Sequence, residues 1–313
     1  EVVDAARDNN KPIVLINGDL TIIIPPEALP VSGDLEISMD TVDAQDVPGF
    51  PDDVTGKEIY EFDANIGGDD QHNFGEEITI TLPIPEGTSD PEKLVIYYLD
   101  ETTGEWQYIG GRIVDGQLVF TTTHFSRYLV GESAKTFADI TSHWAKDDIE
   151  VMAARQIVNG ISDTNFGPNN PTTRAHFAAL LSRILGLTEQ AQNSYSDVVT
   201  STWYEEDILK AVQAGLIKGY GNQLRPDDYI TRQEMAVMIM RAYAYAGGEV
   251  DAAFAGNFSD SSQLASWAED AVNQASSLGI ITGLPNGTFA PLKNASRAEA
   301  TVMLKKLMDE LGI

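Results

Sequence analysis

A spacing that recurs three times along residues 137–311 limits the folds open to this chain more than any other feature. In every copy a Trp is followed after 16 residues by a Gly, and a Pro and then an Arg follow that Gly at nearly constant distances. The period is about 60 residues, and the apolar positions recur at helical spacing. Two amphipathic helices cannot bury their apolar faces alone, so we expect three helix–loop–helix units that pack together. The repeats run over residues about 136–190, 194–247 and 257–313.

An arginine occupies the first position of the second helix in each copy, directly after a Thr or Ser N-cap. These arginines are Arg174, Arg232 and Arg297. Glu234 and Glu299 complete capping boxes in the second and third copies, whereas His176 replaces the carboxylate in the first. A cation at a helix N-terminus costs up to about 1 kcal/mol. We therefore expect an anionic ligand to offset this cost, and an Arg→Ala change to leave the free protein folded.

Residues 1–132 follow a different, two-residue period. Apolar, β-branched and aromatic residues alternate or run together between clusters of Pro, Gly, Asp and Asn, which predicts seven or eight short strands and a β-sandwich. The expected strands cover residues 13–16, 20–24, 35–40, 59–66, 77–84, 94–100, 106–111 and 117–123. The predicted fold is thus multidomain, with an all-β sandwich over residues 1–132 and an all-α region over residues 133–313.

Composition narrows the class of protein further. The 313 residues include no Cys and carry a net charge of −28. Residues 1–132 hold 27 acidic and 6 basic side chains, and residues 133–313 hold 21 and 14. This charge argues against a nucleic-acid partner, which requires a basic surface. We predict no membrane span, because no apolar run approaches about 20 residues. A start without Met, on EVVDAARDNN, is typical of a mature protein or an excised piece of a longer one.

Taken together, the repeated motifs resemble three tandem S-layer homology (SLH) domains. Each copy opens with an aromatic residue, a small residue and Asp, as in FADITSHWA, YSDVVTSTWY and FSDSSQLASWA. Each continues into a Gly-rich loop and a Thr/Ser-Arg helix start, as in NGISDTNFGPNNPTTRAHF, GLIKGYGNQLRPDDYITRQEM and GIITGLPNGTFAPLKNASRAEA. Departures from the family pattern are His176, Gln233, Leu224 and Ser296.

This resemblance implies a secreted protein of the cell wall or S-layer of Gram-positive or related bacteria. SLH triplets form a pseudo-threefold helical trimer within one chain. They anchor it non-covalently by binding a secondary cell-wall polysaccharide, often with pyruvate ketals on N-acetylmannosamine. An alternative is a lattice protein that acts mainly by self-assembly, including through regions upstream of residue 1.

Twelve residues are the candidates for polysaccharide binding, with no cofactor or metal expected. An arginine guanidinium suits a carboxylate, a Trp can stack on a sugar, and glycines let the backbone approach a ligand. The candidates are Arg174, Arg232, Arg297, Trp144, Trp203, Trp267, Asp139, Asp197, Asp260, Gly160, Gly219 and Gly283. The structural alternatives are a core role for each Trp, and turn or capping roles for the Asp and Gly residues.

One tripeptide in the first half suggests chemistry. His124-Phe125-Ser126 resembles the self-cleavage site of autoproteolytic sandwiches related to those of ankyrins and netrin receptors, and LTIIIPPEAL resembles the same type of sandwich. Cleavage between Phe125 and Ser126 would require Ser126 to attack the Phe125 carbonyl in an acyl shift. The alternative is a plain final strand, and we expect no cleavage and no other enzymatic activity. Asp52-Asp53 and Asp69-Asp70 read as solvated loop acids rather than a calcium site.

Overall fold

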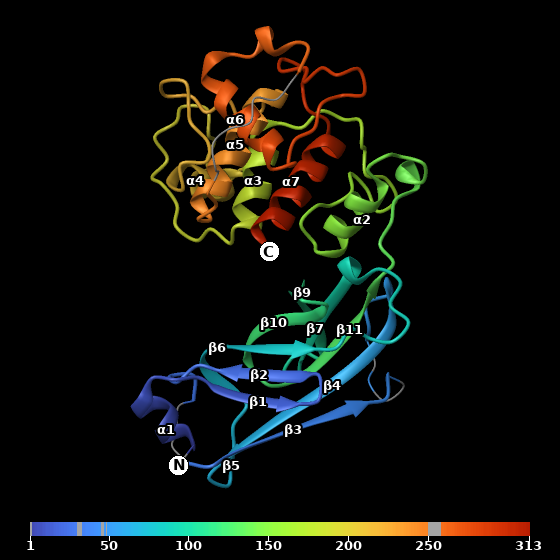
Figure 1. The fold of residues 1–313 in the computed structure, drawn as a ribbon, viewed down its shortest axis with the longest axis vertical. Helices are drawn as coiled ribbons and strands as arrows, with labels where there is room; N and C mark the ends of the chain where they lie inside the picture. The colour runs from blue at the N-terminus through green and yellow to red at the C-terminus, as the bar shows by residue number, and fades with distance from the viewer. Residues whose placement is uncertain (1, 30–32, 45–46, 48, 250–257) are drawn as a thin grey trace. The chain divides into compact units, whose positions relative to one another are not determined.

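The chain forms two compact units, residues 1–135 and 136–313. The computed structural model describes residues 2–29, 33–44, 47, 49–249 and 258–313. Residue 257, the expected start of the third repeat, lies outside the described residues. Figure 1 labels most of the helices and strands of both units.

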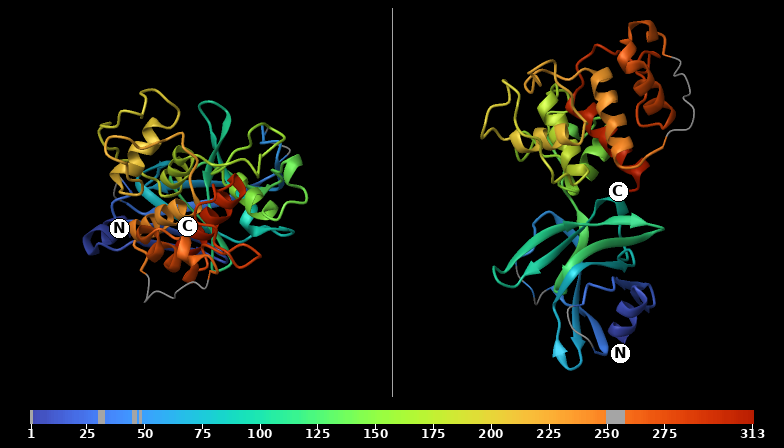
Figure 2. Two further views of the ribbon diagram at one scale, coloured as in Figure 1. Left: turned by 90° about the horizontal axis from the view of Figure 1, so that it is seen from above. Right: turned by 90° about the vertical axis from the view of Figure 1, so that its left-hand side faces the viewer.

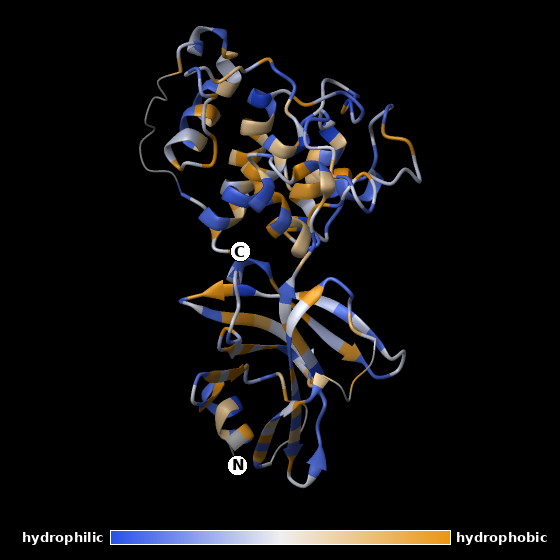
Figure 3. Ribbon diagram, turned by 90° about the vertical axis from the view of Figure 1, so that its right-hand side faces the viewer, coloured by the Kyte–Doolittle hydropathy of each residue, from blue (hydrophilic) through white to orange (hydrophobic). Residues whose placement is uncertain are grey.

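The first unit contains two antiparallel sheets that share one apolar core, to which Ile22, Ile80, Phe62 and Tyr128 belong. The first sheet has the order β1 (Ile13–Asn17), β2 (Leu20–Ile24), β6 (Asn73–Leu82), β10 (Gln117–His124), β9 (Arg112–Val114). The second has the order β3 (Leu35–Val42), β4 (Val54–Ile66), β11 (Arg127–Ser133), β7 (Leu94–Asp100), β8 (Glu105–Gly110). The bands of alternating hydropathy along these strands are visible in Figure 3.

Several elements of this unit were not expected from the sequence, among them the short strand β9, which pairs with β10. Helix α1 (Val2–Asn9) precedes the first strand, and the acidic pair Asp69–Asp70 forms the short strand β5 beside β4 instead of a loop. Strand β11 is the largest omission, because it pairs with β4 on one side and β7 on the other. Its Gly131 lies where the strand pattern of the sequence ends. In the sheet, a Cβ there would lie 2.5 Å from Val54 and 2.8 Å from the Thr55 carbonyl, so the glycine permits close pairing.

The second unit contains six described α-helices, two for each repeat, and one shared apolar core. The helices are α2 (Lys146–Ala154), α3 (Arg174–Ile184), α4 (Glu205–Gln213), α5 (Arg232–Tyr245), α6 (Ser266–Ser277) and α7 (Arg297–Leu311). The first helix of one repeat packs on the second helix of another, in the pairs α3–α4, α5–α6 and α2–α7, and α3, α5 and α7 contact one another. The views in Figures 1 and 2 agree with this arrangement. None of the described helices has the length and apolar character of a membrane span.

A closed ring of backbone hydrogen bonds connects the three repeats just before α3, α5 and α7. The Thr172 N–H donates to the Ala295 carbonyl (2.9 Å), Ala295 donates to Ile230 (2.9 Å), and Ile230 donates back to Thr172 (3.0 Å). The helices then begin as expected. Capping boxes are confirmed at Thr231 and Ser296. At Thr173 the side chain accepts from the His176 N–H, without a carboxylate to complete the box.

The arginine of each repeat extends into the loop of another repeat. Arg174 donates to the carbonyls of Leu224 (3.0 Å) and Lys218 (3.2 Å) in the second repeat. Arg232 donates in the same way to Phe289 (2.7 Å) and Thr282 (3.1 Å) in the third. Arg297 donates to Phe166 (3.0 Å) and Asn159 (2.7 Å) in the first.

Two of these arginines also contact a glutamate, Arg174 with Glu234 at 3.1 Å and Arg232 with Glu299 at 2.9 Å. The expectation that only a ligand explains these cations is therefore corrected. Their guanidinium groups point away from the helix axis. They donate hydrogen bonds to loop carbonyls that would otherwise lack partners.

The His124-Phe125-Ser126 turn connects β10 and β11, and the contacts of its side chains are structural. The Ser126 hydroxyl donates to the Leu99 carbonyl at 2.8 Å. Phe125 is buried in the core, where its ring packs against Phe62 and Phe74. The His124 ring packs edge-on against Tyr98, with 4.6 Å between centroids. An acyl shift requires the serine hydroxyl to approach the Phe125 carbonyl with a base nearby, and Ser126 is instead engaged with Leu99.

We predict that the arginines stabilise the free protein. Arg232 is 2% exposed, and its loss leaves two loop carbonyls and the buried Glu299 without this partner. Arg232→Ala should lower the free energy of unfolding by about 3–5 kcal/mol. Arg297→Ala should cost less, about 1.5–3 kcal/mol, because no glutamate is left behind. Chemical denaturation of each variant measures this. A melting temperature that stays level or rises would show that the helix dipole dominates.

We also predict that the turn at Phe125 stays intact. Purified wild-type chain and Ser126→Ala should each give one intact mass, with or without hydroxylamine, which cleaves the ester that an acyl shift would form. Two fragments that meet between Phe125 and Ser126 in the wild type, and one species in the variant, would establish self-cleavage.

Candidate functional site

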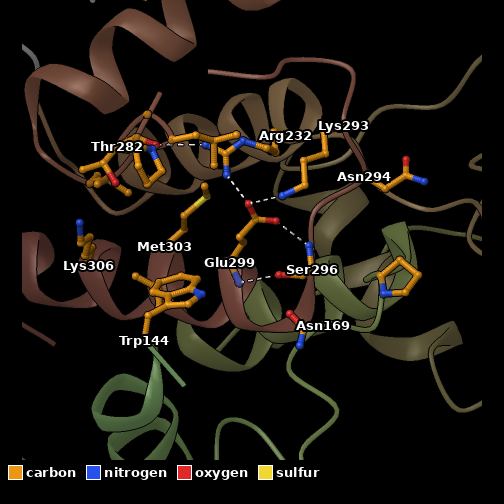
Figure 4. Close-up of a pocket in the computed structure, with 16 residues that line it drawn as sticks. Trp144, Asn169, Arg232, Thr282, Lys293, Asn294, Ser296, Glu299, Met303 and Lys306 are labelled. Atoms are coloured by element: carbon orange, nitrogen blue, oxygen red, sulfur yellow. Dashed lines mark hydrogen bonds and ion pairs between the residues drawn. The ribbon is translucent and has the colours of Figure 1, made fainter. Parts of the chain in front are cut away.

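Three cavities of the second unit share one design. The Arg232 groove has a volume of about 590 Å³, and its lining includes Arg232 from the second repeat, Trp144 from the first, and Gly283 and Glu299 from the third. Figure 4 shows Trp144 and Arg232 on opposite sides of it, with the Glu299 carboxylate between them. Every repeat thus contributes to the wall, so the groove exists only when all three are folded together.

The other two cavities repeat this combination in rotated order. The Arg174 groove, of about 190 Å³, combines Arg174 of the first repeat, Trp267 of the third, and Gly219 and Glu234 of the second. The Arg297 groove, of about 370 Å³, combines Arg297 of the third repeat, Trp203 of the second, and Gly160 and His176 of the first. The expected grouping of a turn, an Arg and an aromatic residue is present, but its members come from three different repeats.

The tryptophans are surface residues, which answers the alternative that they form the core. Trp144, Trp203 and Trp267 are 66%, 56% and 55% exposed. Large exposed aromatic side chains beside a cavity are typical of binding sites, because the apolar surface gains energy only when a partner covers it. The Trp203 ring lies 4.4 Å from the His176 ring, centroid to centroid.

The three aspartates have structural partners and do not line the grooves. Asp139 accepts hydrogen bonds from the Phe166 N–H at 2.8 Å and the Gly167 N–H at 2.7 Å. Asp197 and Asp260 accept the equivalent pairs in their own loops, at 2.8–2.9 Å. Burial raises the pKa of Asp139, but these backbone hydrogen bonds outweigh it, so the pKa is lowered from its ordinary value. The aspartates hold the loops that the arginines contact.

The glycines line the grooves, and each also has a packing role. A Cβ on Gly160 would lie 2.6 Å from the Phe137 ring and 2.7 Å from the Asn165 carbonyl. A Cβ on Gly219 would lie 2.8 Å from the Tyr195 ring, and one on Gly283 would lie 2.9 Å from the Phe258 ring. The aromatic residue that opens each repeat therefore packs against the glycine of its own loop, which explains why both recur at a fixed spacing.

The grooves are rich in positive charge although the chain is acidic. Burial raises the pKa of Glu299, but the Ser296 backbone N–H, Lys293 and Arg232 outweigh it and lower that pKa. Glu234 is held below its ordinary pKa in the same way, chiefly by Thr231 and Arg174. Each glutamate is therefore ionised at neutral pH and counts as one negative charge, against two or three arginines and lysines in each lining.

One set of site residues was missed by the sequence analysis. Arg183, Arg241 and Lys306 line the three grooves. Each follows its own repeat's helix-start arginine by nine residues, which is 2.5 helical turns. A basic residue at the same offset in all three copies could have revealed these positions from the sequence. In any single copy it resembles an ordinary solvent-exposed charge on a helix.

Comparison with known proteins agrees with the repeat pattern. A family model described as the S-layer homology domain matches residues 136–178, 194–236 and 257–301. The chain is 35% identical over its whole length to 17% of an amylopullulanase of Thermoanaerobacterium thermosulfurigenes. It is 38% identical over 69% of its length to 20% of an exoglucanase of Acetivibrio thermocellus.

An S-layer protein of Bacillus anthracis is 31% identical over 58% of the chain, which corresponds to 22% of that protein. The chain thus spans a fifth or less of the first two relatives' length. The second unit therefore belongs to the S-layer homology domain family, of which it carries three tandem copies.

Proposed function

We propose that the three grooves bind an anionic secondary cell-wall polysaccharide, with a pyruvylated N-acetylmannosamine unit as the recognised group, and so anchor the chain to the wall. SLH domains anchor surface proteins to cell walls. The anionic specificity is our inference, and one observation carries it. In every groove the lining combines an exposed tryptophan of one repeat, an arginine of a second and a glycine of the third.

The groove chemistry matches the two parts of such a sugar. The C–H face of a pyranose ring is apolar and can cover the exposed indole. A ketal carboxylate can accept charge-assisted hydrogen bonds from arginine and lysine. Two of the three cavities, at about 370 and 590 Å³, have volumes typical of small-molecule pockets. We propose that the repeats act as a pseudo-threefold trimer, because each groove draws on all three.

The first unit is proposed to be a non-catalytic connecting domain. The alignment with the amylopullulanase includes both this unit and the SLH region, because it covers the whole chain. Its most suggestive motif, His124-Phe125-Ser126, has the serine hydroxyl bonded to Leu99. Its acidic character suits a spacer that stays soluble outside the cell.

One prediction of this proposal concerns anchoring by the second unit alone. Residues 133–313 should sediment with purified wall and stay in solution with wall stripped of its secondary polysaccharide, because all three grooves lie in this unit. A control without wall separates anchoring from self-assembly. Sedimentation without wall would favour the lattice alternative, and failure to sediment with intact wall, while the full chain does, would place the anchor elsewhere.

The second prediction uses the exposed tryptophans to separate binding from stability. Trp144→Ala, Trp203→Ala and Trp267→Ala should each change the free energy of unfolding by less than about 0.5 kcal/mol, because the side chains are exposed. Each should weaken disaccharide binding at its groove about tenfold, as loss of an aromatic anchor does. Tyr245→Ala is the matched control, since Tyr245 is 54% exposed and lies outside all three groove linings. Equal effects of all four variants would remove the tryptophans from the site.

A further inference from the structure

The Arg297 groove lacks a carboxylate that the other two grooves have. Arg174 and Arg232 each donate from Nη1 to the glutamate at the third position of the next repeat's second helix. His176 occupies the equivalent position beside Arg297. Among the described residues, Arg297 forms its two carbonyl hydrogen bonds, and its guanidinium carbon lies 4.5 Å from the Phe166 ring centroid. The Asp139 carboxylate attracts Arg297 electrostatically, but no carboxylate of the described residues forms an ion pair with it. No Asp or Glu in the described part of the chain lines this groove.

His176 does not replace the glutamate as a partner of Arg297. Its Nδ1 lies 2.7 Å from the Thr173 hydroxyl, and its ring packs on Trp203. Burial lowers the pKa of His176, with Arg297 and Arg183 lowering it further and Asp227 opposing them, so the imidazole is largely neutral at neutral pH. It therefore supplies no negative charge to Arg297, and Arg183 at the same groove is already paired with Asp207 at 2.9 Å.

A second polar group of this groove has unused capacity. Thr172 lines it, is 4% exposed, and its hydroxyl is the one buried side-chain oxygen or nitrogen of the described residues without a hydrogen-bond partner. The equivalent positions in the central ring are Ile230 and Ala295, which carry no polar side chain. Both unusual features of the first repeat, His176 and Thr172, therefore fall on the same groove.

We propose that the Arg297 groove is the principal carboxylate-binding groove, in which the ligand's carboxylate takes the place that Glu234 and Glu299 hold beside the other two arginines. This inference rests on the proposed function and assigns its anionic specificity chiefly to one of the three grooves. A ligand carboxylate that enters the Arg174 or Arg232 groove meets an ionised glutamate already bound to the arginine, and the two negative charges repel. In the Arg297 groove it meets a guanidinium with no such competitor.

Residue 176 is the specificity-determining position, and changing it tests the idea without removing Arg297. His176→Glu in the full chain supplies the missing carboxylate, which can pair with Arg297 and complete the capping box with Thr173. The variant should melt about 2–4 °C higher and bind a pyruvylated N-acetylmannosamine disaccharide about tenfold more weakly in calorimetric titration. His176→Gln, which adds no charge, should bind within about threefold of wild type.

The reciprocal change is Glu299→Gln in the Arg232 groove. Glutamine can still cap the helix but removes the competing charge, so binding of the same disaccharide should strengthen at this groove. The disaccharide without its pyruvate ketal should show none of these differences, because it carries no carboxylate.

The outcomes separate this inference from the proposed function. If wild type binds the pyruvylated disaccharide but His176→Glu binds it equally well while melting higher, the groove assignment is overturned and the anchoring function stands. If wild type binds the pyruvylated and unpyruvylated sugars alike, the anionic specificity and the groove assignment both fail. Weaker binding in His176→Glu together with stronger binding in Glu299→Gln supports the proposal.

Discussion

Each helix-start arginine connects two repeats, and the architecture of the second unit depends on this contact. A guanidinium presents several N–H donors in one plane, so it can satisfy two loop carbonyls and still face a third group. The carbonyls belong to the loop that an aspartate of the same repeat holds from the other side through two backbone N–H groups. Loop shape, repeat packing and the position of a positive charge are thus set by one interaction, used three times.

The contact resolves the apparent conflict between the arginine and the helix dipole. The dipole costs up to about 1 kcal/mol only for a charge that stays near the helix axis. These side chains turn toward the neighbouring loop, where hydrogen bonds to charged groups contribute about 1.5–3 kcal/mol each. Stability and binding consequently share the same side chains, so a loss of binding in an arginine variant does not by itself identify a ligand contact. The exposed tryptophans and position 176 are cleaner probes of the grooves.

The imperfections of the repeat are as informative as its regularity. The changes in the first repeat leave the ring closed, because all three arginines bind their loop carbonyls and all three backbone hydrogen bonds of the ring are formed. The first repeat carries His176 and Thr172 where the other copies have glutamate and apolar residues. The groove that receives both residues keeps its arginine and its tryptophan, so the fold has been retained while the charge of one site has changed.

The sequence by itself determined the local structure of the second unit: the helix starts, their caps, the repeat period and the residue types of the site. These follow from short-range chemistry, because N-caps, helical periodicity and turn glycines act within a few residues. It also indicated a β-rich first half, although strand β11 and its Gly131 were missed, since strand pairing depends on distant partners such as Val54.

Only the tertiary structure decided which repeat contributes the arginine of each groove and which repeat contributes the tryptophan. It also placed the three aspartates at the loops and not in the groove linings. It also decided that His176 stands beside Arg297, 121 residues further along the chain. The physical reason is that identical repeats satisfy the same local rules in any order of packing. The long-range closure of the ring, with its backbone and guanidinium hydrogen bonds between repeats, selects one of these orders.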